Sequence, residues 1–292
     1  MCSKHPISLG VIGGTGIYEL DGFEIEEEKA VKTPFGDPSD SIIIGRLKST
    51  RLAFLTRHGR GHHRIPHEIN YRANIYAMKS LGISRLLSIS AVGSMKEEIK
   101  PGDLVVVDQF FDRTRNRISS FFGNGLAAHV GFGDPVCKEL SSLTIKAARG
   151  PGVTVHPRGT YLCIEGPRFS TRAESQIFRS WGVDVIGMTN LPEAALAREA
   201  ELCFSTLALV TDYDCWHEEE EDVTVGSVLQ TLKQNSQKAK ATISTLAALL
   251  EENPGFDCTC TSSLKTAIMT HPDRIDPDLR KNLSIIVDKY LS

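Results

Sequence analysis

The sequence contains no run of the roughly 20 apolar residues that a membrane-spanning helix needs. It also lacks an excess of positive charge, because 33 lysines and arginines against 36 aspartates and glutamates leave a net charge of −3. Neither a membrane nor a nucleic acid is therefore expected as a partner. Residues 1–8 are polar and lead straight into an apolar run, which does not fit a secretory signal. We expect a cytoplasmic enzyme that acts on small molecules.

A disulfide framework is not expected either. Seven cysteines among 292 residues are few for such a framework, and most should be buried thiols. Cys258 and Cys260, one residue apart, are the exception. They could bind a metal, but no second Cys or His pair at zinc-like spacing accompanies them. A strained disulfide or a redox role are further alternatives, and the interpretation we favour is two reduced thiols without a function.

The chain shows no internal repeat, no low-complexity segment and no linker that would divide it. Short apolar runs alternate with segments of helical periodicity. The predicted strands are 7–13, 42–45, 52–56, 85–90, 104–107, 160–164, 183–187 and 204–210, and the predicted helices are 70–81, 136–148, 171–181, 193–202, 224–250 and 279–290. This alternation predicts one α/β domain over residues 1–292, with three α/β/α layers, a mixed central sheet and a helical tail from about residue 254.

Two carboxylates follow the last predicted strand, at Asp212 and Asp214. In open α/β sheets, ligands bind outside the carboxyl ends of the strands. Side chains two apart in an extended segment point the same way, so both acids would face one pocket. Such a pair suits a ligand edge rich in hydrogen-bond donors, such as the amino group and a protonated N7 of adenine. Two solvated loop acids would explain the same pattern.

Several other predicted strands end in residues suited to bind an anion. Residues 13–16 read Gly-Gly-Thr-Gly, which is either a phosphate-binding turn or a structural one, and no dinucleotide-binding fingerprint continues from it. Arg57 and His58 begin a basic stretch after the strand 52–56. In a chain of negative net charge this stretch indicates a local anion site, although a plain basic loop is an alternative. Its position after two earlier strands argues against a histidine phosphatase.

Small and aromatic residues lie at the remaining strand ends. Residues 88–94, Ser-Ile-Ser-Ala-Val-Gly-Ser, would allow close contact between the backbone and a ligand. Phe169, in the segment 165–174, could stack on a planar base or pack in the core. Met188 could lie under a sugar ring and Thr189 could reach phosphate, although a methionine at a strand end is more often part of the core.

Taken in order, these motifs resemble one family. They are the segments 13–16, 34–40, 57–59, 69–74, 90–94, 165–174, 188–189 and 211–214. Over residues 7–250 the chain resembles the 5′-methylthioadenosine phosphorylases of the trimeric purine nucleoside phosphorylase class. The resemblance implies a homotrimer, or a dimer of trimers, with sites near subunit interfaces. It also implies no metal and no organic cofactor, with inorganic phosphate as the co-substrate.

The resemblance assigns a role to each candidate residue. The expected phosphate ligands are Thr15, Arg57, His58, Ser90, Ala91 and Thr189. The expected ribose and base contacts are Met188, Phe169, Val92, Gly93, Asp212, Tyr213 and Asp214. Residues expected to set specificity, including an apolar pocket for the 5′-methylthio group and a contact from a neighbouring subunit by His129, are Ser170, Val225, Val228 and His129. Val92 departs from the cysteine that animal members carry there, which leaves the base contacts open.

The implied reaction is phosphorolysis of the C1′–N9 bond, with Asp212, Asp214 and His58 as the catalytic residues. Adenine leaves poorly as an anion, so N7 must receive a proton. We expect Asp212 to donate it and Asp214 to accept from N6, although the two roles could be exchanged. Three alternatives stay open: a 6-oxopurine phosphorylase, which would be expected to carry Asn in place of Asp212, a nucleosidase that uses water, and a nucleoside-binding protein without turnover.

Overall fold

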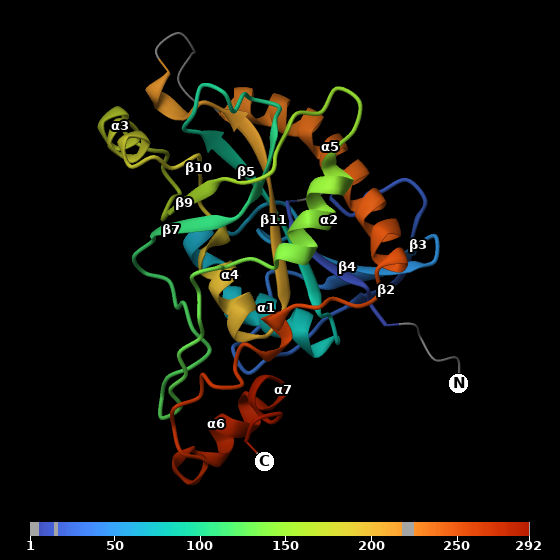
Figure 1. The fold of residues 1–292 in the computed structure, drawn as a ribbon, viewed down its shortest axis with the longest axis vertical. Helices are drawn as coiled ribbons and strands as arrows, with labels where there is room; N and C mark the ends of the chain where they lie inside the picture. The colour runs from blue at the N-terminus through green and yellow to red at the C-terminus, as the bar shows by residue number, and fades with distance from the viewer. Residues whose placement is uncertain (1–5, 15–16, 218–224, 292) are drawn as a thin grey trace.

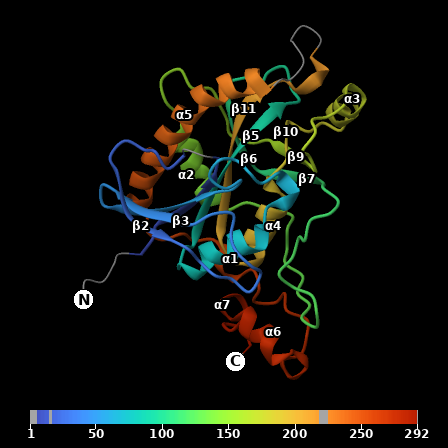
Figure 2. The same cartoon turned by 180° about the vertical axis from the view of Figure 1, so that it is seen from behind.

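The computed structural model describes residues 6–14, 17–217 and 225–291. A mixed sheet lies between two helical layers (Figures 1 and 2). Helices α1 (Tyr71–Ser80) and α4 (Asn190–Glu199) cover one face, and α2 (Lys138–Ala148) and α5 (Val225–Glu252) cover the other. The three-layer α/β/α single domain predicted from the alternation is confirmed. No helix among these residues is both long enough and apolar enough to cross a membrane.

The strand order in the main path of the sheet is β2-β3-β4-β1-β5-β10-β9-β7, and β11, β6 and β8 continue from β5. The strand bounds are β1 Leu9–Gly13, β2 Phe23–Lys29, β3 Ile42–Leu47, β4 Thr50–Thr56, β5 Arg85–Ser94, β6 Leu104–Val107, β7 Gln109–Arg113, β8 Val155–His156, β9 Thr160–Ile164, β10 Val185–Gly187 and β11 Cys203–Asp212. Short 3-10 helices occupy Pro66–Glu68, Asp214–Trp216, Thr259–Ser262 and Pro272–Arg274.

One edge of β5 is divided between two strands, and this division positions the site. Strand β11 follows β5 in parallel from Arg85 to Gly93 on the other edge. On the divided edge, β1 pairs with β5 only as far as Ser88, and β10 pairs antiparallel with Gly93 and Ser94. None of the described strands pairs with residues 89–92 on that edge, so it stays open between the ends of β1 and β10. Ligands of open α/β sheets bind at such a position, and we call this gap the crevice.

Strands β3, β4, β5 and β11 are longer than predicted, and the two longest have a reason that the apolar pattern does not show. Strand β5 continues to Ser94 and β11 to Asp212, because the two keep pairing beyond their apolar cores. The segment 90–94 is therefore strand and not a loop, and Asp212 is the last strand residue. The edge strand β2 was missed because its charged sequence FEIEEEK buries little apolar surface.

Helix ends follow their capping residues. Asn70 caps α1 by accepting a hydrogen bond from the Ala73 N–H, and Gly82 follows its end with φ +76°. The predicted capping box of α3 (Arg172–Ser180) is present, with Thr171 and Glu174 each bonded to the other's backbone N–H.

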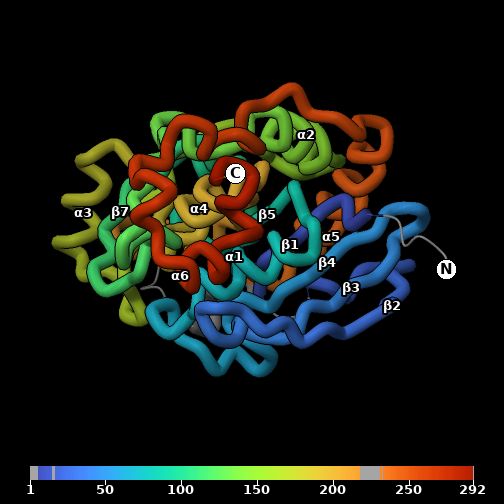
Figure 3. Tube along the Cα trace, turned by 90° about the horizontal axis from the view of Figure 1, so that it is seen from below, coloured from blue at the N-terminus to red at the C-terminus, as the bar shows by residue number. Residues whose placement is uncertain are grey.

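The segment after α5 wraps beneath α1 and α4 (Figure 3). The predicted helix 279–290 is wrong in its extent, because two short helices, α6 (Pro277–Asn282) and α7 (Ser284–Val287), replace it. Asp276 caps α6 just before Pro277, which starts that helix earlier than expected. Leu283 and Val287 join the apolar cluster that contains α1 and α4. The segment is thus part of the apolar layer formed with α1 and α4.

Candidate active site

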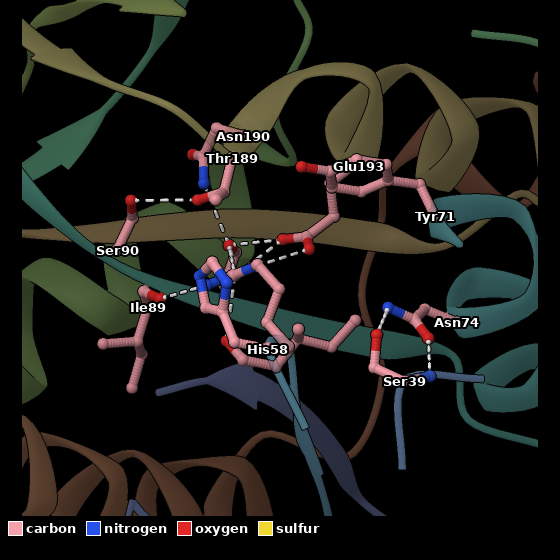
Figure 4. A network of polar contacts seen from close by, with 12 residues as sticks. Ser39, His58, Tyr71, Asn74, Ile89, Ser90, Thr189, Asn190 and Glu193 are labelled. Atoms are coloured by element: carbon pink, nitrogen blue, oxygen red, sulfur yellow. Dashed lines mark hydrogen bonds and ion pairs between the residues drawn. The ribbon is translucent and has the colours of Figure 1, made fainter. Parts of the chain in front are cut away.

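Ala91 is the one exposed residue of β5, and it lies at the crevice. Nine of the ten residues of β5 are buried or half-buried, and Ala91 is exposed. Ala91 is one of residues 89–92, which have no partner strand on the edge of β5 that β1 and β10 share. Strand β10 runs antiparallel to β5 towards this gap, so its continuation brings Thr189 back beside Ser90 (Figure 4). The structure thus brings Ser90, Ala91 and Thr189 together, and their role as phosphate ligands stays a prediction.

A buried tyrosine that was not predicted completes this hydroxyl cluster. Ser90 Oγ lies 3.1 Å from the Tyr161 hydroxyl and 3.3 Å from Thr189 Oγ1. The Thr189 N–H donates to the same Tyr161 oxygen at 3.4 Å, and burial raises the pKa of Tyr161 to about 12. A Cβ at Gly187 would lie 2.0 Å from that oxygen, so glycine is required there. Tyr161 lies mid-strand in β9, and no sequence signal distinguished it from a core aromatic residue.

Arg57 enters the crevice from the end of β4 but turns into the core. It is 2% exposed, and Glu193 beside it is 0% exposed. Its Nε and Nη2 donate to the two Glu193 oxygens, each at 2.9 Å, and Nη1 donates to the Ile89 carbonyl at 2.8 Å. Nη2 also donates to Ser88 Oγ, which in turn donates to Glu193 at 2.6 Å. Burial alone would lower the pKa of Arg57, and the Glu193 carboxylate raises it above its ordinary value.

This network changes the expected part of Arg57. The guanidinium holds the backbone of β5 next to Ser90 and, among the described residues, leaves one Nη1 N–H uncommitted. Arg57 is therefore placed to position the crevice as much as to contact an anion. Glu193 was overlooked because it read only as the first residue of a helix. It lies instead inside α4, on the face turned towards β5 (Figure 4).

His58 is neutral in this structure. Its Nδ1 lies 2.8 Å from the Arg64 carbonyl and therefore carries the proton, which leaves Nε2 as an acceptor. Burial, partly opposed by the Arg64 hydrogen bond, and the neighbouring Arg57 charge lower the pKa of His58 to about 4. The stacked ring of His62, centred 4.3 Å away, adds to this effect. We expected a histidine donor that can be charged, and the unprotonated Nε2 instead suits a phosphate that still carries a proton.

The basic stretch after His58 is partly neutralised. Arg60 pairs with Asp40 at 2.9 Å and also with Glu28. Burial favours the neutral acid, yet hydrogen bonds from Arg60 and Thr56 lower the pKa of Asp40 to about 2. Arg60 therefore braces the loop that carries His58 and is not a free cation for a ligand.

Asp212 and Asp214 meet beside Gly93 at the end of β11, although not as two side chains on one strand face. Strand β11 ends at Asp212, and Asp214 has a left-handed φ of +53°. Asp212 Oδ1 accepts the Asp214 N–H at 2.8 Å and comes within 2.8 Å of where a Cβ on Gly93 would lie. Asp214 is buried, and its Oδ2 accepts from Ser175 at 2.5 Å. Burial raises the pKa of Asp214, which the Ser175 bond partly opposes.

The residues expected around the base lie on β5, just after β10 and on the loop before α3. Val92 is 2% exposed within β5, and Met188 is half-buried just after β10. Phe169 is 45% exposed on the loop before α3, so its ring is accessible for stacking on a planar base. Ser170 Oγ is buried without a hydrogen-bond partner among the described residues, which suits a polar ligand atom. The Tyr213 ring packs against Trp216 and His217.

Four predicted residues cannot be placed against the crevice. Thr15 lies outside the described residues. Val225 and Val228 lie in the first turn of α5, where the side chains are likewise outside the described part. His129 is exposed on the loop after β7, where its N–H donates to the Ala267 carbonyl of the C-terminal segment. Its expected contact with a neighbouring subunit stays a prediction.

Comparison with known proteins agrees with this arrangement. The model of the Phosphorylase superfamily matches residues 8–248. The chain belongs to this superfamily, whose members share the phosphorylase fold described above, and within it to the S-methyl-5′-thioadenosine phosphorylases. A protein of that name from Geobacter sulfurreducens is 51% identical over 284 residues, which cover 97% of this chain and 99% of the relative. Another, from Hyperthermus butylicus, is 51% identical over 263 residues, with 89% and 95% covered.

Solved structures give the same family. A methylthioadenosine phosphorylase sourced from an antarctic soil metagenomic library superimposes with a TM-score of 0.92 at 42% identity, covering 97% of this chain and all of that one. A variant of the adenosine/methylthioadenosine phosphorylase of Schistosoma mansoni, in complex with methylthioadenosine, superimposes with a TM-score of 0.80 at 33% identity over 97% and 98% of the two chains.

Proposed function

We propose that the protein catalyses the phosphorolysis of 5′-methylthioadenosine to adenine and 5-methylthio-ribose 1-phosphate, a step of methionine and purine salvage. The observation that carries the proposal is the unpartnered edge of β5. The hydroxyl cluster at Ser90 lies at one end of this stretch of β5, and the acid pair from the end of β11 adjoins Gly93 at its other end. Three residues of extended strand span about 10 Å. A ribose fits between an anion and a base held at those two ends.

Inorganic phosphate is the co-substrate at the Ser90 end. Ser90, Thr189 and the exposed Ala91 backbone supply donors without net charge. We assign Thr15, the free N–H of Arg57 and His58 to the same anion, with His58 Nε2 accepting the proton of a monoprotonated phosphate. The C1′–N9 bond breaks before the new bond is complete, and the phosphate oxygens stabilise the cationic ribosyl group and then attack C1′.

The acid pair assists departure of adenine. A carboxyl group donates to N7 only if it holds a proton near neutral pH, which requires a raised pKa. Burial shifts the pKa of Asp214 in that direction, and Asp212 accepts a hydrogen bond from the Asp214 backbone N–H. The pair therefore supplies the proton to N7 and an acceptor for N6. Changing the carboxyl group that donates to N7 into Asn should move the substrate preference from adenine to 6-oxopurine nucleosides, because an amide donates to O6. The variant with that change in preference identifies the donor.

The base and the 5′ group contact the remaining residues. Adenine stacks on Phe169 over Val92 and Gly93, the ribose lies over Met188, and Ser170 Oγ and Tyr213 border the base. The 5′-methylthio group enters an apolar pocket that includes Val225 and Val228. A trimer, or a dimer of trimers, would bring His129 of a neighbouring copy to that pocket, and the exposure of His129 in the single chain leaves it available.

The test follows adenine release from 5′-methylthioadenosine for the wild type, Asp212→Asn and Asp214→Asn, with inosine in parallel. The variant that lacks the N7 donor should lose kcat with 5′-methylthioadenosine by about 100-fold or more and should gain relative activity with inosine. If both variants keep the wild-type ratio of kcat/KM for the two nucleosides, the acid pair does not read the base.

A further inference from the structure

Four cysteines from three distant parts of the sequence meet at one point outside the active site. The sulfur atoms of Cys137, Cys203, Cys258 and Cys260 all lie within 4.8 Å of one another. Cys203 Sγ and Cys258 Sγ are 3.4 Å apart, and all four side chains are free thiols. Sequence reasoning set a metal aside here because no second cysteine pair stood at short spacing, but the fold supplies that pair from Cys137 and Cys203.

We propose that these four thiols form a structural tetrathiolate site for a zinc ion. A tetrahedral Zn²⁺ with Zn–S bonds of about 2.3 Å holds its sulfurs about 3.8 Å apart, a spacing that falls within the limit observed for this cluster. Binding forms four Zn–S bonds and releases four thiol protons to water, with no change of oxidation state. Soft thiolate donors select zinc over the hard cations magnesium and calcium.

The surroundings supply what such a site needs. Cys137 and Cys203 are held by the core, since the Cys137 N–H donates to the Phe204 carbonyl at 2.8 Å. Four thiolates on Zn²⁺ leave two negative charges, which need partners when buried. Arg198, only 9% exposed, places Nη1 3.8 Å from Cys260 Sγ, and Cys137 occupies the N-cap position of the 11-residue helix α2.

The ion would fasten the C-terminal segment to the core. Cys258 and Cys260 lie at the start of that segment, whereas the other two ligands come from α2 and β11. Further along, Ala267 accepts the backbone N–H of His129, so the segment also holds the loop that carries His129. None of the four cysteines is among the residues assigned to the substrates, and the role of the site is structural.

Elemental analysis of the full chain tests the proposal. The protein is purified without chelators in a phosphine reductant, after growth in medium with added zinc. Wild type should hold about one Zn²⁺ per chain, and Cys258→Ser/Cys260→Ser should hold background levels. Cys215→Ser, which removes a thiol outside the cluster, should keep the wild-type content. In wild type, a chelator should release the ion and make the C-terminal segment more sensitive to limited proteolysis.

A second measurement does not depend on the variants folding. The reduced, zinc-free wild type is titrated with Co²⁺, and a tetrathiolate site should develop the intense thiolate-to-cobalt and tetrahedral d–d absorption at one equivalent. The proposal is wrong if the four cluster thiols are still alkylatable in excess Co²⁺ and no such absorption appears. It is equally wrong if mass mapping finds the four cysteines joined as disulfides in protein kept anaerobic from lysis onward.

Discussion

Removing the Glu193 carboxylate should lower the free energy of unfolding more than removing any surface charge. Glu193 and Arg57 are 0% and 2% exposed and share two hydrogen bonds of 2.9 Å. Glu193→Ala leaves the guanidinium buried without a counter-charge, which costs about 3–5 kcal/mol of unfolding free energy. Urea unfolding followed by far-UV circular dichroism, at one fixed protein concentration, measures this loss.

Two further variants separate charge from packing. Asp134→Ala removes a carboxylate from the exposed pair with Lys138 and should cost less than about 1 kcal/mol. The double variant Arg57→Met/Glu193→Leu replaces the buried pair with apolar groups and should recover most of the stability lost in Glu193→Ala, without recovering activity. A loss for Glu193→Ala no larger than that for Asp134→Ala would refute the view that Glu193 compensates the buried charge of Arg57.

Three more predictions concern the crevice. Tyr161→Phe should raise the phosphate KM several-fold, at about 1 kcal/mol, because Ser90 Oγ and the Thr189 N–H lose their partner; an unchanged KM would show that the hydroxyl has no part. Gly187→Ala should reduce phosphate affinity more than Tyr161→Phe and lower the melting temperature, since its Cβ would collide with that oxygen. For His58, the pKa is about 4 when folded against 6.5 unfolded, so protonation opposes folding and stability falls as the pH drops from 6.5 towards 4. Urea unfolding at pH 7 and pH 5 should show a loss smaller by up to about 2 kcal/mol in His58→Gln than in wild type, and equal losses would contradict the assignment.

The layers of the fold and the ends of its main helices were predictable from local signals. Apolar runs gave most central strands, and Asn70, Thr171 and Gly82 marked helix ends through their own backbone chemistry. The full lengths of β5 and β11 were not predictable, because the two strands extend each other by pairing across a large sequence separation. The edge strand β2 buries too little to leave an apolar pattern.

The small polar residues of the candidate site were predictable, and the buried side chains that contact them were not. Ser90 and Thr189 stood out as small polar residues in motifs at strand ends, and they do meet. Glu193 and Tyr161 read as ordinary helix and core residues, since nothing in the sequence shows which buried polar group faces another. The cysteine cluster was not predicted for the same reason, because its members come from three separate parts of the sequence.

The central claim is that phosphate is the nucleophile at this crevice. The most direct measurement follows adenine release from 5′-methylthioadenosine in phosphate-free buffer and again with added inorganic phosphate, with the sugar product identified by mass spectrometry. The account predicts release only with phosphate, and a stoichiometric yield of 5-methylthio-ribose 1-phosphate. Release at the same rate without phosphate, with free 5-methylthio-ribose as the product, would contradict it and make the protein a nucleosidase.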